Sequence, residues 1–328
     1  MRRYTNTANI PLSLAVFLAT DHYDHDSTTI SATALLKPLK QIILSARVPQ
    51  ELALADISGL VPSRMGTAYH DAIERAWLHN HKDAMKALGY PARVIERVLV
   101  NPEPHELYPD CIPVYLERRS SKEIAGRTIT GKFDFVGQGR LEDFKSTSVY
   151  TWINNTKDDD YIMQGSLYRW LNQDIVTDDQ MAIQFLFTDW SQAMSRNDPK
   201  YPAQRTMQKV FDLKPVTETE HFVTQKLRLI DTHWNDEQHL IPACTDSDLW
   251  RREPVFKYYK NPAKTTRSTK NFDNKQDAYL QLSADGNVGI VKEVQGQVTA
   301  CKYCAAFPVC EQAKALVASG DLFFYPWS

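Results

Sequence analysis

A hairpin with two opposed carboxylates constrains this chain more than any other feature. Residues 131–146 read as two short strands joined by a Gln-Gly turn at 138–139. A two-residue loop there places Asp134 directly opposite Asp143, with the Cβ atoms about 5 Å apart. Like charges repel at that distance, and a divalent cation between them turns the repulsion into coordination. Lys145 follows Asp143 by two residues, so it points to the same face of the strand.

The same hairpin admits a second interpretation. In this register Lys132 lies opposite Lys145, so the charges alternate along the face and could form a surface salt network without a metal. Gln-Gly is also a weaker turn signal than Asn-Gly. The hairpin alone therefore leaves two hypotheses open. One is a surface charge ladder, and the other is the set of groups that metal-assisted phosphodiester hydrolysis uses.

Length and composition set the class of the molecule. The chain has 328 residues, 43% hydrophobic and 24% charged, which is ordinary for a globular protein of one large domain or two. The net charge of −2 gives no overall attraction for nucleic acid, so such binding needs a local basic patch. No run approaches the about 20 apolar residues that span a membrane, and residues 10–19 lack a signal-peptide cleavage site. We expect a cytoplasmic protein without membrane association.

Hydrophobic periodicity predicts helices on both sides of a run of strands. Helices are expected at 31–47, 63–88, 161–172 and 217–234, and further strands at 113–118, 124–130, 181–189 and 208–213. This order predicts an α/β fold in which helices flank a mixed central sheet. Three regions are expected: a loosely structured lead-in at 1–30, a core at 31–240, and a cysteine-rich module at 241–328 packed on the core.

Two pairs of polar side chains with four-residue spacing lie on the predicted helices. His70 and Glu74 share one face of the helix at 63–88, and Gln164 and Tyr168 share one face of the next helix. An imidazole at this place could ligate a metal ion or orient a ligand. Each pair alone is more often structural, so its meaning depends on the other motifs.

Four motifs in order resemble the RecB-type branch of the PD-(D/E)XK nuclease superfamily. They are Gly66-x-x-x-His70, Gly131-x-x-Asp134, Asp143-x-Lys145 and Gln164-x-x-x-Tyr168, within a match of about residues 31–190. The segment 30–40 is also similar to the opening helix of phage-encoded members. The resemblance implies a restriction-endonuclease-like fold, and host cytoplasm as the location if a phage encodes the chain.

The resemblance also implies a metal site. His70, Asp134 and Asp143 would ligate the catalytic ion, together with the backbone carbonyl of Phe144. Carboxylate oxygens suit Mg²⁺ or Mn²⁺, which lowers the pKa of bound water and offsets charge in the transition state.

The remaining motif residues have implied roles around this ion. Lys145 would position or help to deprotonate the attacking water, Gln164 and Tyr168 would hold the lysine and the nucleic-acid backbone, and Glu74 would support the ligands. The implied activity is a DNA exonuclease that acts on ends or single strands in recombination, repair or phage DNA processing. A helicase or recombination protein is a candidate partner. The alternative is a non-catalytic nucleic-acid-binding module with the same fold.

A basic segment near the C-terminus suggests where a strand could bind. Residues 251–270 contain seven basic side chains and only one acidic side chain. Phe256, Tyr258 and Tyr259 are interleaved with them, and basic groups with aromatic faces are typical of single-strand binding. A solvated loop is an equally good interpretation of this segment.

Cysteine spacing predicts a second metal site. Cys301, Cys304 and Cys310 form a C-x₂-C-x₅-C pattern that favours metal ligation over disulfides. The pattern resembles the tail of iron–sulfur nucleases of the RecB branch, including exonucleases of CRISPR adaptation. In those relatives the fourth cysteine precedes the histidine helix, but here no cysteine precedes Cys111. We expect Cys244 as the fourth ligand, with Cys111 or a non-cysteine residue as the alternative.

The ligand type leaves the metal open. Four thiolates serve a [4Fe-4S] cluster or a structural Zn²⁺. The family likeness favours the cluster, and either group would contribute folding energy to the C-terminal segment.

Overall fold

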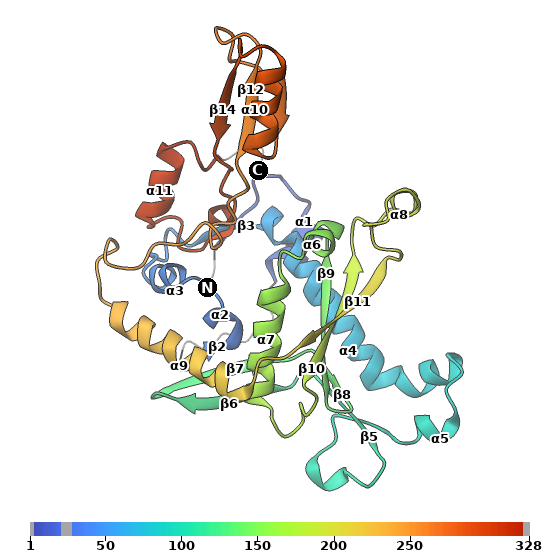
Figure 1. The fold of residues 1–328 in the computed structure, drawn as a ribbon. Coiled ribbons are helices and arrows are strands. Elements are labelled where there is room, and N and C mark those ends of the chain that lie inside the picture. Colours follow the sequence, from blue (N-terminus) through green and yellow to red (C-terminus); the bar gives the residue numbers. More distant parts are fainter. Residues whose placement is uncertain (1–2, 21–27, 324–328) are drawn as a thin grey trace. The chain divides into compact units, whose positions relative to one another are not determined.

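The chain forms two compact units in a computed structural model that describes residues 3–20 and 28–323 (Figure 1). One unit is Met1–Lys37 with Leu54–Arg228, and the other is Pro38–Ala53 with Leu229–Ser328. The three regions expected from the sequence stay a prediction. That division does not anticipate that residues 38–53 join the C-terminal part of the chain. No helix within 3–20 or 28–323 is both long and apolar enough to cross a membrane.

A six-stranded mixed sheet forms the centre of the first unit, in the strand order β11-β10-β9-β8-β5-β4. Its strands are β4 (Val98–Val100), β5 (Ile112–Leu116), β8 (Phe135–Gly137), β9 (Arg140–Thr147), β10 (Gln180–Phe187) and β11 (Thr206–Asp212). The β9–β10 and β4–β5 pairs are parallel, and the other three pairs are antiparallel. The predicted mixed α/β architecture is confirmed.

Two long helices cover opposite faces of this sheet, α4 (Val61–Ala87) and α7 (Asp158–Leu171) (Figure 1). Successive residues of a strand point to opposite faces. On one face Trp77 of α4 packs against Phe135 with ring centroids 5.2 Å apart. On the other face Gln164 of α7 donates a hydrogen bond to Asp143. Helices therefore flank the sheet as expected.

A smaller sheet continues from the large one. It contains β2 (Ile30–Ser31), β7 (Arg127–Lys132) and β6 (Arg119–Ile124) in that order. The single strand expected at 124–130 is wrong, because Ala125 and Gly126 adopt φ of 51° and 72° and turn the chain into a hairpin. Alanine rarely adopts positive φ, so Ala125 is a weak signal for this turn.

One glycine allows α7 to approach this small sheet closely. A Cβ atom on Gly131 would lie 2.6 Å from Cδ1 of Leu171 and 3.1 Å from Cδ1 of Tyr168. A larger residue would push α7 away from β7, so Gly131 is needed for packing. Gly131 of the Gly-x-x-Asp motif thus has a role in packing that does not depend on catalysis.

Two expectations for the N-terminal part are wrong. The helix expected at 31–47 is divided into α2 (Ala32–Leu35) and α3 (Leu39–Ala46), because Pro38 starts a new helix. The lead-in at 1–30 is not loosely structured where it is described. There β1 (Arg3–Thr5) pairs in parallel with β3 (Leu54–Asp56), and α1 (Leu12–Ala19) follows. Residues 21–27 of the lead-in lie outside the described residues.

The remaining elements of the first unit are short, apart from α9, which runs into the second unit. They are η1 (Ile57–Leu60), α5 (Ala92–Ile95), η2 (Pro104–Glu106), α6 (Val149–Asn154), α8 (Gln192–Asn197) and α9 (Val216–His233). The expected helices at 63–88, 161–172 and 217–234 are confirmed as α4, α7 and α9, with ends shifted by a few residues.

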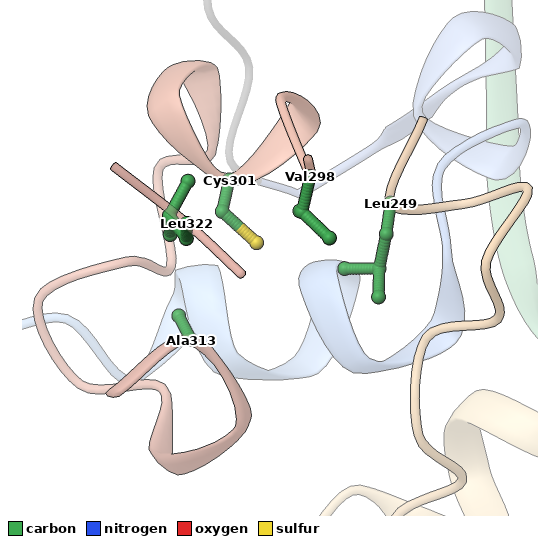
Figure 2. Packing of buried hydrophobic residues seen from close by; sticks show 5 residues of the cluster. All are labelled: Leu249, Val298, Cys301, Ala313 and Leu322. Carbon is green, nitrogen blue, oxygen red and sulfur yellow. The ribbon is translucent and has the colours of Figure 1, made fainter. Parts of the chain in front are cut away.

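The second unit combines a small sheet with a cysteine-rich part. The strands β12 (Val255–Tyr259), β13 (Lys270–Phe272) and β14 (Ile290–Val294) form an antiparallel sheet in the order β13-β12-β14. Helix α10 (Lys275–Ala284) follows β13, and η3 (Ala300–Tyr303) and α11 (Glu311–Ala318) follow β14. Figure 2 shows Cys301 among the buried side chains of this unit.

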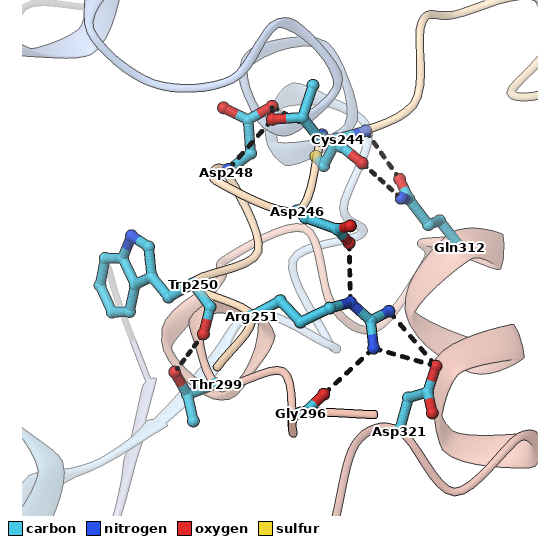
Figure 3. Close-up of polar contacts among 10 residues, drawn as sticks. Cys244, Asp246, Asp248, Trp250, Arg251, Gly296, Thr299, Gln312 and Asp321 are labelled. Carbon is cyan, nitrogen blue, oxygen red and sulfur yellow. Dashed lines mark hydrogen bonds and ion pairs between the residues drawn. The ribbon is translucent and has the colours of Figure 1, made fainter. Parts of the chain in front are cut away.

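The basic segment does not present its aromatic rings to solvent. Phe256, Tyr258 and Tyr259 are 8%, 1% and 6% exposed, because they form the core under β12. Arg251 is held by Asp246 and Asp321 (Figure 3). The expectation that these three aromatic side chains stack on bases is therefore wrong. A half-buried strand and a base-stacking surface both interleave aromatic with basic residues, so the sequence alone does not distinguish them.

Candidate active site

The predicted hairpin forms with the predicted turn. Gly137 pairs with Arg140 and Phe135 with Glu142, so a two-residue loop joins β8 and β9. Gln138 and Gly139 have φ of 51° and 87°, which matches the primed turns of tight hairpins.

The expected pairing of Lys132 with Lys145 is wrong. Lys132 belongs to β7 and pairs with Arg119. The chain bends at Asp134 as it leaves the small sheet and enters the large one, so the hairpin register ends at Phe135. The surface charge ladder therefore does not form.

The bend brings together two acidic side chains from separate strands. The chain crosses between the two sheets twice, at Glu117 between β5 and β6 and at Asp134 between β7 and β8. The backbone N–H of Glu117 donates to the carbonyl of Asp134 at 3.1 Å, which ties the two crossings to each other. Glu117 adopts φ of 49°, an uncommon conformation for a non-glycine residue.

Helix α4 adds an imidazole to the two acids. His70 Nδ1 lies 3.4 Å from Asp134 Oδ1 and 3.8 Å from Glu117 Oε1. Its Nε2 lies 2.9 Å from the carbonyl oxygen of Phe144. Ligand atoms of His70, Glu117 and Asp134 all lie within 4.8 Å of one another, and among the described residues no other three His, Cys, Asp or Glu side chains do so.

The sequence prediction missed Glu117. The residue stands at the end of the strand expected at 113–118, one position from the start of the next strand. Its proximity to Asp134 depends on two sheets crossing, which local spacing does not reveal. An acid at a strand end shortly before the Gly-x-x-Asp motif was the available signal.

Asp143 and Lys145 point to the other side of β9, toward α7. Asp143 is 2% exposed, and its Oδ1 accepts a hydrogen bond from Gln164 Nε2 at 3.2 Å. Gln164 also donates to Tyr168 Oη at 3.1 Å, so this pair orients the carboxylate. Lys145 Nζ lies 2.5 Å from Asp143 Oδ2, which accepts no aligned hydrogen bond.

One residue of the predicted set lies apart from this group. Glu74 follows His70 by one turn on α4 and is half-buried. Within the described part of the chain, no hydrogen bond or ion pair connects Glu74 to the site. The contacts of the predicted residues thus form two groups. His70, Asp134 and Phe144 contact one another on the α4 side, and Asp143, Lys145, Gln164 and Tyr168 do so on the α7 side. The charges of Asp134 and His70 act on Asp143 and so couple the two groups.

The electrostatics of the site show competing charges. Burial lowers the pKa of His70, but hydrogen bonds to Asp134 and Glu117 outweigh it and raise the pKa to about 10. Burial and the charge of Asp134 raise the pKa of Asp143 to about 6, although Lys145 opposes the shift. Burial raises the pKa of Asp134, but its contacts with His70 outweigh this and lower it.

These groups fit a hard divalent cation. The site offers carboxylate oxygens, a backbone carbonyl and an imidazole, the donor types that Mg²⁺ and Mn²⁺ accept. The proton on His70 and the ammonium of Lys145 compensate the negative charge of the two aspartates. A cation could replace that compensation.

A second candidate site lies in the second unit. Cys244, Cys301, Cys304 and Cys310 line a cavity of about 30 Å³ together with Lys40 of α3. Cys111 belongs to the first unit. Gln312 of α11 holds the backbone of Cys244 through two hydrogen bonds of 2.9 Å (Figure 3).

Two thiols of this cavity, those of Cys244 and Cys301, are buried enough to resist ionisation. Burial raises the pKa of Cys244 to about 12 and that of Cys301 to about 11. No three of the cysteine sulfur atoms lie within 4.8 Å of one another.

Comparisons with known proteins give only distant likenesses. No family model and no curated protein matches the chain. The solved structure of SSO0001 is similar with a TM-score of 0.39 and 14% identity, over 64% of this chain and 80% of that one. A phage related exonuclease from Haemophilus somnus 129PT is similar with a TM-score of 0.24 and 16% identity, over 35% of this chain. The match spans 60% of that exonuclease's length.

Proposed function

We propose that this chain is a divalent-metal-dependent DNA nuclease of the RecB type with a PD-(D/E)XK core. The observation that carries the proposal is the convergence of Asp134, Asp143, Lys145 and His70 from three separate parts of the first unit. A buried Asp143 at 2% exposure beside a second carboxylate and a lysine has no evident use in a scaffold.

His70, Asp134 and Asp143 would hold Mg²⁺ or Mn²⁺ with the carbonyl oxygen of Phe144, and Glu117 lies close enough to join them. The ion supplies positive charge that lowers the pKa of a water and offsets charge on the phosphate. To bind the ion, His70 must give up a proton.

Lys145 would position the attacking water, and α7 positions the carboxylate of Asp143. The Lys145 ammonium lies beside Asp143, so it can hold the attacking water against the scissile phosphate and offset developing charge there. Gln164 fixes Asp143 in one orientation and is itself fixed by Tyr168. Substrate positions thus depend on a helix and a strand rather than on loops.

The nuclease activity is tested with labelled linear DNA, in the presence of Mg²⁺ or Mn²⁺ or of a chelator. We expect degradation by the wild type with metal, and none in the Asp143→Ala and Lys145→Ala proteins. The matched control is Asp159→Ala, because Asp159 is an exposed acid in the first turn of α7. Undiminished cleavage in both site variants would remove this assignment.

The preference for ends is tested with circular and end-blocked substrates. An exonuclease degrades the linear strand and leaves the circle intact, whereas an endonuclease cuts both. Binding of DNA by the wild type without any cleavage would support the non-catalytic binding module instead. Action in recombination, repair or phage DNA processing, with a helicase or recombination partner in the cytoplasm, is part of the same proposal.

We further propose a [4Fe-4S] cluster at Cys244, Cys301, Cys304 and Cys310, with structural Zn²⁺ as the alternative. The observation that supports a shared metal is that all four cysteines line one cavity. Visible absorbance and metal analysis of the purified protein distinguish iron from zinc. Cys244→Ser should lose the metal and Cys111→Ser should retain it, and the opposite result would assign the fourth ligand to Cys111.

A further inference from the structure

A cavity of about 390 Å³ extends from the candidate metal ligands along α4 to the end of α1. Its walls include His70, Glu117 and Asp134 at one end, and Phe17 and Thr20 at the other. All of these residues belong to the first unit. The volume is in the range of pockets that bind small molecules, so the cavity suits a nucleotide rather than a duplex.

The α4 wall of the cavity has a regular spacing. Arg64, Thr67 and His70 follow at intervals of three residues, so they lie along one side of the helix. Six residues of α-helix span about 9 Å. That length reaches from the metal ligands to a neighbouring sugar and phosphate. The guanidinium of Arg64 and the hydroxyl of Thr67 suit the phosphate.

Helix α1 places an aromatic ring at the far end of the cavity. Its side chains Leu12, Leu14, Val16 and Phe17 are 78%, 48%, 57% and 42% exposed, although α1 is anchored by the buried Leu18. Arg64 Nε donates to the carbonyl of Leu18 at 3.0 Å, which fixes the end of α1 against α4. Of the four exposed apolar side chains, Phe17 lines the cavity.

We infer that this cavity binds the nucleotide next to the cleaved phosphate, with its base unpaired and stacked on Phe17. The inference rests on the proposed nuclease function and adds the side chain on which the base stacks. A base that stacks on Phe17 is not stacked within a duplex, so it is unpaired. The substrate bound in this way is a single strand or a frayed end.

The stacking contact is tested by binding, which separates it from catalysis. Short single-stranded DNA is bound to the Asp143→Ala protein, with an intact base or an abasic residue at each position in turn. Stacking on an aromatic side chain contributes about 5- to 150-fold to affinity for one base. We expect the additional change Phe17→Ala to weaken binding by that factor, and Phe17→Trp to preserve it.

The abasic strand and a second variant make the test specific. At one position the abasic residue should weaken binding with Phe17 present and have no further effect in Phe17→Ala. Leu14→Ala is the matched control, since Leu14 is exposed on the same helix and does not line the cavity. Equal binding by Phe17→Ala and its parent, or equal losses in both α1 variants, would overturn the inference. Absence of cleavage by wild type would instead remove the proposed function.

Discussion

The two candidate metal sites differ in how they are held in the absence of a metal. In the first unit His70 pairs with Asp134, and Lys145 pairs with Asp143, so internal charges support the geometry. In the second unit four cysteines and a lysine line a small cavity, and no carboxylate pairs with that lysine among the described residues. If both proposed metals bind, we expect the first site to keep its geometry without its ion and the second unit to lose stability without its metal.

The largest expected effect is on the stability of the second unit. Structural Zn²⁺ in zinc-finger peptides binds with about 10–16 kcal/mol, so loss of one ligand of a structural metal in Cys244→Ser should destabilise this unit by several kcal/mol. Thermal unfolding followed by calorimetry measures the effect, with Cys111→Ser as the control. An unchanged transition in Cys244→Ser would show that the second site is also preformed.

The next largest effect is a loss of cleavage activity with little change in stability. Asp143→Asn should reduce cleavage by about 1,000-fold, or about 4 kcal/mol, because the amide cannot supply an anionic ligand. The free energy of unfolding of the metal-free protein should change little, because the cost of burying a charged Asp143 beside Asp134 offsets the ion pair that Asp143 forms with Lys145. Denaturant unfolding and a cleavage assay measure both quantities. A large loss of stability would contradict a preformed site.

A smaller effect is expected from the buried lysine of the second unit. Lys40 is 6% exposed and donates to the carbonyls of Gln238 at 2.8 Å and Ile241 at 3.0 Å. A metal bound by four thiolates carries negative charge, which the ammonium offsets. Lys40→Met should therefore weaken metal retention by about 10- to 100-fold, as lost supporting contacts do. Metal release to a chelator measures this, and Gln41→Met in the same cavity is the control.

The smallest effect is a pH dependence of metal binding in the first unit. The pKa of His70 is raised to about 10, so an ion must displace one proton at lower pH. Affinity for Mn²⁺ should rise about tenfold per pH unit as the pH approaches 10, because one proton is released. The pKa of Asp143 is raised to about 6, so below that pH metal binding should release a second proton, from Asp143.

Calorimetry in buffers of different ionisation enthalpy counts the released protons. A pH-independent affinity between 7 and 9 would exclude His70 as a ligand. In the metal-free protein the raised pKa of His70 also affects folding stability. Its stabilising contribution is fully present below about pH 6.5 and is lost as the pH rises through about 10.

Local patterns predicted the parts of the site that lie within one hairpin or one helix. The turn at Gln138-Gly139 set the register of β8 and β9, and four-residue spacing placed Gln164 beside Tyr168. Pro38 was visible in the sequence, but the apolar stripe on both sides concealed the break.

Contacts between distant strands could not be predicted in the same way. Glu117 joins Asp134 because two strands change sheets at the same place, and neither residue signals this locally. The bend at Asp134 also moved Lys132 away from Lys145. Nonlocal geometry of this kind depends on how the whole sheet twists and packs.

The interleaved order of the two units has a consequence for biosynthesis. Lys40 of α3 and its acceptor Gln238 are separated by 198 residues. At about 5–20 residues per second, α3 leaves the ribosome roughly 10–40 s before that partner is made. Until then Ile43 and Leu44 lack the buried neighbour Ile241. The nascent chain thus carries an uncovered apolar helix for most of its synthesis, and we expect chaperones to bind this helix.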